Sequence, residues 1–182
     1  MVRCLELFET IERRRSVRTF KDKPVKKKDL ARILNAAILA PSAGNIQPWE
    51  FIVTTDAEGR RDLAAAALGQ CWMEGAPVII TVCAKEEASA LRYGERGSRL
   101  YCIQDTAAAV QNILLASTAL GYGSCWVGAF DEDEVRRALK IPKGTRPVAI
   151  IPIGVPGEKP EARPRRDLKR VVHSEVYGEQ RF

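Results

Sequence analysis

The stretch that most constrains the fold of this chain is residues 101–120, with the sequence YCIQDTAAAVQNILLASTAL. Its residues favour an α-helix, and apolar side chains occupy most of the circumference of that helix. A helix of this kind has to be buried from several sides. In a chain of 182 residues, the stretch therefore predicts a central helix, which the rest of the chain or a second subunit covers.

Helical and strand patterns alternate along the rest of the sequence. Apolar residues recur at helical spacing between residues 30 and 38, whereas the β-branched run APVIITVCA at 76–84 is typical of a buried strand. We further expect helices over 5–11, 57–70 and 131–140, strands over 50–55 and 146–154, and a loop with a short strand over 121–130. No repeat or linker interrupts this order, which predicts a single α+β domain over residues 1–182.

The composition excludes several classes of protein. Apolar residues make up 46% of the chain and charged residues 29%, and no apolar run approaches the roughly 20 residues of a membrane span. The first residues lack a secretory signal pattern, so we expect a cytoplasmic protein without a membrane partner. One histidine and five scattered cysteines argue against a metal site or a disulfide framework. The cysteines are Cys4, Cys71, Cys83, Cys102 and Cys125.

The net charge of +6 is concentrated in two segments. Residues 13–28 hold nine lysines and arginines against one acidic residue, a local charge of +8, and residues 159–170 hold six against two, a local charge of +4. The remaining residues therefore carry −6. If the two basic segments meet in space, their charge converges on a single anionic ligand.

The first basic segment contains the motif Arg14-Arg15-Ser16-x-Arg18. Guanidinium groups pair bidentately with phosphate oxygens, and a serine hydroxyl between them adds a further donor. The motif is open to three interpretations: a solvated basic turn, a basic arm that binds nucleic acid, or half of a phosphate pocket.

Two loops offer groups suited to a flat heterocyclic ligand. The loop APSAGNIQPWEF at 40–51 holds Ser42, Asn45 and Gln47 between two prolines, and amide side chains supply donors and acceptors together. In GYGSCWVGAF at 121–130, Gly128 allows close approach of the backbone. This second loop is not the Rossmann fingerprint, because Trp126 stands where the third glycine is required.

These blocks together resemble the nitroreductase family of FMN flavoproteins. The resemblance rests on RRRSVRTF, APSAGNIQPWEF, GYGSCWVG, IPIGVPGEKP and RPRRDLKRVV, which follow one another in this order over nearly the whole chain. It implies an α+β sandwich in which helices flank a central mixed or antiparallel sheet. It also implies an intertwined homodimer that binds FMN non-covalently at the subunit interface.

The resemblance also implies which residues contact the cofactor. The phosphate would bind Arg14, Arg15, Ser16, Arg18 and either Arg165 or Arg166. The loop after the second helix would contribute Pro41, Ser42, Asn45 and Gln47, and a backbone N–H near Gly128 and Ala129 would face flavin N5. Gln70 stands where some relatives contact the ring or the nicotinamide.

The implied activity is the transfer of hydride from NAD(P)H, as co-substrate, to a small acceptor such as a nitroaromatic or a quinone, by a ping-pong mechanism. We expect no catalytic side chain. A flavin reductase, a reductive dehalogenase and an FMN carrier without turnover share the same binding residues, and a nucleic-acid-binding module that uses residues 13–28 is the rival from another class. Residues 84–100 are either a lid over the flavin or a plain surface connection.

Overall fold

The computed structural model of the protein describes residues 6–179. Cys4, and Leu5 of the helix expected over 5–11, lie outside the described residues. The helices and strands follow one another as α1 Leu7–Arg13, α2 Lys27–Ile38, η1 Ala43–Asn45, β1 Trp49–Thr54, α3 Ala57–Ala66, η2 Cys71–Gly75, β2 Val78–Lys85, α4 Glu86–Arg96, η3 Gly97–Tyr101, α5 Cys102–Ala119, β3 Gly123–Ser124, α6 Glu132–Leu139, β4 Thr145–Gly154 and η4 Leu168–Arg170.

The four strands form one sheet in the order β1-β2-β4-β3. Every neighbouring pair is antiparallel, with Trp49 opposite Ala84 at one end of the β1–β2 ladder. Seven of the eight residues of β2 are buried, because β2 is a central strand whose two faces are both covered. The predicted α+β fold is confirmed, and the antiparallel alternative for the sheet is correct.

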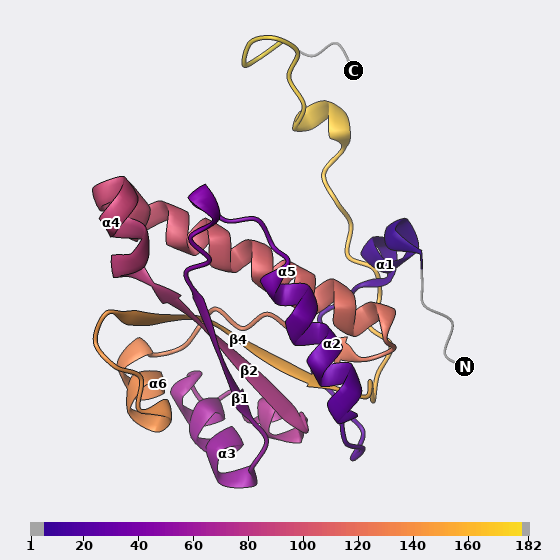
Figure 1. Ribbon diagram of the computed structural model, residues 1–182. Helices are drawn as coiled ribbons and strands as arrows, with labels where there is room; N and C mark the ends of the chain where they lie inside the picture. Colours follow the sequence, from indigo (N-terminus) through magenta and orange to yellow (C-terminus); the bar gives the residue numbers. More distant parts are fainter. Residues whose placement is uncertain (1–5, 180–182) are drawn as a thin grey trace.

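Helices cover the two faces of the sheet and enclose two hydrophobic cores (Figure 1). On one face, α2 and α5 pack over the sheet, and Ile33, Ile113 and Ile80 are fully buried there. On the other face, α3 and α6 bury Leu63 together with Ile79. Consecutive residues of β2 thus serve opposite cores, as the alternation of side chains along a strand requires.

Helix α3 ends four residues earlier than the segment 57–70 that we expected to be helical. Asp56 caps its beginning, where the carboxylate accepts a hydrogen bond from the backbone N–H of Gly59 at 2.6 Å. Beyond its end, Leu68 and Gly69 adopt left-handed backbone conformations with φ of 59° and 74°. A left-handed residue cannot continue a right-handed helix, so the chain turns here into η2.

Helix α5 is the predicted central helix, but this chain alone does not cover all of it. The side that faces the sheet and α2 is buried. The opposite side carries the exposed Gln104 and Gln111 and the half-buried Ala108, Leu115 and Thr118. These positions lie three or four residues apart and so form one continuous stripe along the helix.

Most of the segment 84–100 is helical, although Ala84 and Lys85 end β2. The two interpretations of the segment, a lid over the flavin and a plain surface connection, both stay predictions. Helix α4 occupies most of the segment and is interrupted at Gly94, whose φ of 57° and ψ of −144° are not helical. The five residues of η3 then make a π-helical turn that leads directly into α5. The acidic and basic residues of the segment conceal its helical character in the sequence.

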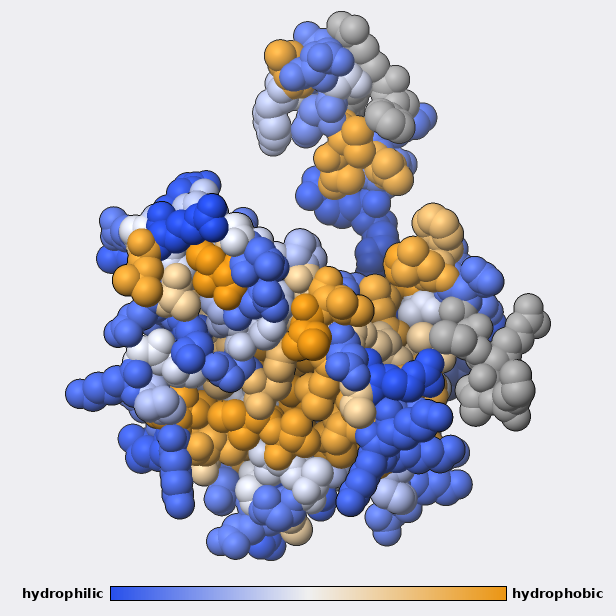
Figure 2. Space-filling model, viewed as in Figure 1, coloured by the Kyte–Doolittle hydropathy of each residue, from blue (hydrophilic) through white to orange (hydrophobic). Residues whose placement is uncertain are grey.

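The chain beyond β4 leaves the body of the molecule as an extended arm (Figure 1). Apolar side chains on this arm are exposed, including Leu168, Val171 and Tyr177, the last of which is 93% exposed. Figure 2 shows further apolar surface on the body, in the region of α2 and β1. Of the helices between residues 6 and 179, none combines the length and apolarity that crossing a membrane would require.

Candidate functional site

The segment after α1 runs beside the edge of the sheet and brings the two basic ends of the chain together. The backbone N–H of Val17 donates to the carbonyl of Ser124 in β3 at 3.0 Å, and that of Lys21 donates to the carbonyl of Val155 at 2.9 Å. A Cβ at Gly123 would lie 2.8 Å from three carbons of Val17. The segment can therefore reach this position only because residue 123 is a glycine.

The two basic ends line a common cavity of about 710 Å³, here called the arginine cavity. Its lining holds Arg14, Arg15, Ser16, Arg18, Glu158, Pro160, Glu161, Ala162, Arg163, Pro164 and Arg165. Five arginines against two glutamates leave a net charge of +3 around it. The guanidinium of Arg166 instead donates to the carbonyl of Arg170 at 3.2 Å. The structure thus brings Arg165, and not Arg166, to the arginine motif.

Glu158 fixes the arginine segment at the cavity. Its Oε1 accepts the backbone N–H groups of Arg18 at 2.6 Å and Thr19 at 3.0 Å. The Arg18 guanidinium remains available on the outside, with its Cζ 5.8 Å from the centroid of the Trp72 ring. Sequence reasoning missed Glu158 and Trp72, because a contact across 140 residues of chain leaves no local pattern.

The thiol of Cys125 lies beneath this cavity. Burial raises the pKa of Cys125, although the nearby Arg18 guanidinium and the Ser16 side chain oppose that effect. A raised pKa keeps the thiol protonated at neutral pH. Cys125 therefore packs as a small apolar residue and supplies no negative charge to compete with an anionic ligand.

Next to the cavity, Gln70 connects η2 to the loop that precedes α6. Its amide nitrogen donates to the carbonyls of Ala67 at 2.9 Å and Ala129 at 3.1 Å. Gly128 is exposed, and a Cβ there would meet nothing closer than 3.9 Å. Within residues 6–179, the backbone N–H groups of Gly128 and Ala129 make no hydrogen bond. The structure therefore groups Gln70, Gly128 and Ala129, with two donors free on an open surface.

The loop with the amide side chains, here called the amide loop (residues 41–48), is held in a strained conformation. Asn45 and Gln47 have φ of 56° and 54°, values that cost non-glycine residues free energy. Local bonds offset part of this cost: the Gln47 backbone N–H donates to Ser42 Oγ at 2.9 Å, and the Gln47 amide donates to Asn45 Oδ1 at 3.2 Å. Pro41, the first residue of the loop, restricts it further.

Two residues outside the amide loop hold it in place. Asp105 of α5 accepts the backbone N–H of Ala43 at 3.0 Å, and Arg92 of α4 donates to the carbonyl of Gly44 at 3.1 Å. Burial raises the pKa of Asp105, and the bond from Ala43 only partly counteracts this. Sequence reasoning missed both residues, although an aspartate within an apolar helix is itself a signal of a specific partner.

Helix α5 separates the amide loop from the arginine cavity of the same chain. The amide loop meets α5 at Asp105, near its beginning, whereas Val17 and Thr118 line a cavity near its end. Asp105 and Thr118 are 13 positions apart, which corresponds to about 20 Å along a helix. The amide loop and the arginine cavity therefore lie near opposite ends of α5.

The loop at Gly128 also lies on another side of α5 from the amide loop. Gly128 lines a cavity with Ile103 of α5, and Asp105 follows Ile103 by two residues, a rotation of about 200° around the helix. One chain therefore joins the arginine cavity to Gln70, Gly128 and Ala129, but it does not bring Pro41, Ser42, Asn45 and Gln47 to them.

Comparisons with known proteins identify what this arrangement resembles. A model of the nitroreductase family matches residues 11–71 and 64–155. The NADH dehydrogenase of Thermus thermophilus is 32% identical over 187 residues, which cover 88% of this chain and 91% of that protein. The FMN reductase (NADPH) of Bacillus subtilis is 26% identical over 184 residues, covering 94% of this chain and 74% of that protein.

Solved structures agree with these matches. The NADPH:FMN oxidoreductase from Vibrio harveyi, solved in complex with NAD+, superposes with a TM-score of 0.87. It is 27% identical, and the match covers 95% of this chain and 78% of that one.

Proposed function

The chain belongs to the nitroreductase family and is an NAD(P)H-dependent oxidoreductase, and we propose that it binds FMN non-covalently and reduces a small acceptor by a ping-pong mechanism. The chain would form a single FMN-binding domain. Its net reaction moves a hydride from NAD(P)H, together with a proton from water, onto an acceptor such as a nitroaromatic or a quinone, which gains two electrons.

The observation that carries the proposal is the arginine cavity. A phosphate monoester carries about two negative charges near neutral pH, and the cavity offers a net charge of +3 with a serine hydroxyl among its guanidinium groups. These donors fit a phosphate. Arg14, Arg15, Ser16, Arg18 and Arg165 would hold the phosphate of FMN.

The residues grouped around Gln70 fit the edge of a flat ring. The open backbone at Gly128 lets a planar ligand come close, and the free N–H groups of Gly128 and Ala129 would donate to an atom that gains negative charge. Bound there, FMN would accept a hydride from the reduced nicotinamide and deliver it to the acceptor. The protein positions the groups, so we assign no catalytic side chain.

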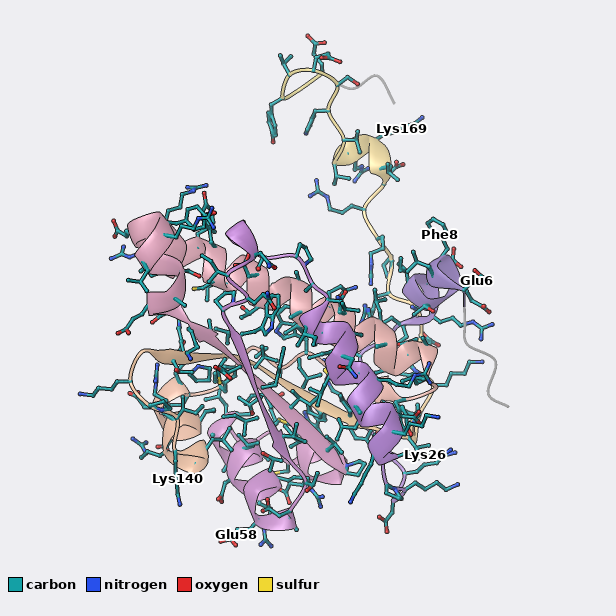
Figure 3. All side chains as sticks on the ribbon, viewed as in Figure 1. Glu6, Phe8, Lys26, Glu58, Lys140 and Lys169 are labelled. Carbon is teal, nitrogen blue, oxygen red and sulfur yellow. The ribbon has the colours of Figure 1, made fainter. Side chains whose placement is uncertain are left out.

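A second copy of the chain would complete the site. Pro41, Ser42, Asn45 and Gln47 lie across α5 from the arginine cavity, so a ligand in that cavity would meet the amide loop of a partner. The uncovered stripe on α5 and the exposed apolar side chains of α1 support a homodimer. Phe8 of α1 is 78% exposed and points away from the body (Figure 3), as expected for a side chain that a partner covers.

The shape of the site supports a ping-pong order. The surface at Gly128 is open, and no Rossmann fingerprint supplies a separate place for the nicotinamide. Donor and acceptor would therefore occupy the same surface in turn.

The arrangement of the basic residues argues against the rival interpretation, a nucleic-acid-binding module. Arg14, Arg15 and Arg18 converge with Arg165 in a cavity and do not spread along a face. Convergence suits one compact anion better than a polynucleotide backbone.

The test is an absorbance spectrum of the purified protein between about 300 and 550 nm, repeated anaerobically after addition of NADH or NADPH. We expect flavin bands that bleach with one of the two donors and return when the acceptor is added. Bands that fail to bleach would contradict the enzyme and favour an FMN carrier. A protein that shows no bands even after FMN is added would contradict the cofactor itself.

A further inference from the structure

Four side chains of α4 and η3 form a cluster that the proposed function leaves unused. Tyr93 and Tyr101 contact each other edge to face, with ring centroids 5.2 Å apart. The Arg92 guanidinium lies 5.5 Å from the Tyr93 centroid, and the Arg96 guanidinium lies 5.3 Å from the Tyr101 centroid. We call these four residues the arginine–tyrosine cluster.

The two arginines of the cluster have no acidic partner. Nearby Arg99 pairs with Glu95 at 3.0 Å, but between residues 6 and 179 neither Arg92 nor Arg96 forms an ion pair. Arg92 donates to the carbonyl of Gly44 and Arg96 donates to the hydroxyl of Tyr101. A guanidinium has five donors, so each arginine keeps most of its donors, and all of its charge, free for an anion.

The cluster and the amide loop form one surface. A Cβ at Gly44 would lie 2.5 Å from the Tyr93 hydroxyl and 2.6 Å from a guanidinium nitrogen of Arg92, so the loop backbone and the cluster are in direct contact. The irregular backbone at Gly94 and the π-helical turn of η3 present the four side chains together. Such π-helical turns occur frequently at functional sites.

Free guanidinium groups beside aromatic rings suit a particular ligand chemistry. Arginine pairs bidentately with a planar carboxylate, and the half-buried rings of Tyr93 and Tyr101 offer contacts to an aromatic body. We propose that the arginine–tyrosine cluster binds the anionic group of the acceptor, so that the enzyme prefers aromatic acceptors that carry a carboxylate. This inference rests on the proposed function. The cluster contacts the amide loop of its own chain, and that loop would contact the FMN held by a partner copy.

Two aromatic nitro compounds, one an anion and one neutral, test this preference. 4-Nitrobenzoate and its methyl ester carry the same reducible nitro group, but only the first is an anion. We expect the wild-type enzyme to have the higher kcat/KM with 4-nitrobenzoate. In the double variant Arg92→Gln/Arg96→Gln, the ratio of kcat/KM for 4-nitrobenzoate to that for the ester should fall about tenfold. The ratio is the readout because a loss of the Arg92 bond to the amide loop would affect both acceptors alike. The variant Arg92→Lys/Arg96→Lys keeps the charge and should retain part of the preference.

Arg99→Gln is the control, because it makes the same kind of substitution in the adjoining turn, at an arginine that is already paired with Glu95. It should leave the ratio between the two acceptors unchanged. Equal kcat/KM values for the two acceptors in the wild type would overturn the inference. An equal loss for both acceptors in the double variant would also overturn it.

Calorimetric titration with benzoate and with benzyl alcohol separates this inference from the proposed function. Neither compound has a nitro group, so the titration measures binding without reduction. Benzoate binding that depends on Arg92 and Arg96 supports the cluster as an anion site even in a protein whose flavin does not bleach. If benzoate binds no more tightly than benzyl alcohol, the inference is refuted even in a protein whose flavin bleaches fully.

Discussion

Replacing Arg18 by alanine should weaken FMN binding while leaving the fold intact. The backbone of Arg18 and Thr19 stays bonded to Glu158 in this variant, so the segment keeps its place. Only the guanidinium is lost, together with its contact to Trp72. A cation–π contact at an exposed site contributes about 0.5 kcal/mol, so the free energy of unfolding should barely change.

The loss in FMN binding should be larger. A hydrogen bond to a charged group contributes about 1.5 kcal/mol at the lower end of its range, the end appropriate to the exposed Arg18. This corresponds to an increase of about tenfold in the dissociation constant. The assay is a fluorescence titration of the apoprotein, in which the quenching of flavin emission reports the bound fraction.

Riboflavin and Arg166 provide the controls. Riboflavin lacks the phosphate, so its dissociation constant should be the same for the wild type and the Arg18→Ala variant. Arg166 directly follows Arg165 in the chain but lies outside the arginine cavity, so Arg166→Ala should bind FMN like the wild type. If Arg18→Ala weakens riboflavin as much as FMN, or if Arg166→Ala matches its effect, the reasoning about the phosphate is refuted.

Three further changes test the fold around the site. Gly123→Ala should lower the free energy of unfolding by about 1–3 kcal/mol, because its Cβ would overlap Val17; an unchanged urea midpoint would contradict this. Burial raises the pKa of Asp105 above its unfolded value, so its contribution to stability is greatest at low pH and falls as the pH rises through the folded pKa. Relative to Asp105→Asn, the wild type should therefore gain stability as the pH drops from 7 towards 4 in urea titrations, and parallel pH curves would refute the assignment. Leu63→Ala should cost about 2–5 kcal/mol because Leu63 is fully buried, whereas Leu68→Ala, at an exposed position, should have little effect in the same titration.

Local patterns in the sequence were sufficient for most of the elements. The apolar run of β2 and the mostly apolar α5 were predicted, because burial on several sides leaves a dense local pattern. The end of α3 was misjudged, because the alanine run at 64–67 favours a longer helix, whereas Leu68 and Gly69 turn left-handed directly after it. Helix α4 was missed, because its charged residues and Gly94 hide the helical period.

The residues of the candidate site were likewise predicted where a local sequence pattern marks them and missed where none does. The arginine motif and the amide loop were found as sequence blocks, and the expectation that the basic ends meet agrees with the arginine cavity. The order of the strands and the roles of Glu158 and Asp105 were not predicted, because each depends on contacts between residues far apart in the chain. The sequence also did not indicate that α5 lies between the amide loop and the arginine cavity of the chain.

The bond from Glu158 to the arginine segment has a consequence for how the protein is made. It joins residues 140 positions apart, so a nascent chain that has emerged only as far as α6 already carries Arg14 and Arg18 but has no place to bind the cofactor. Contacts of such long range form late in folding. Cofactor capture would therefore follow the emergence of Glu158 and of the cavity residues after it, and free FMN would stabilise chains that include them without acting on shorter ones.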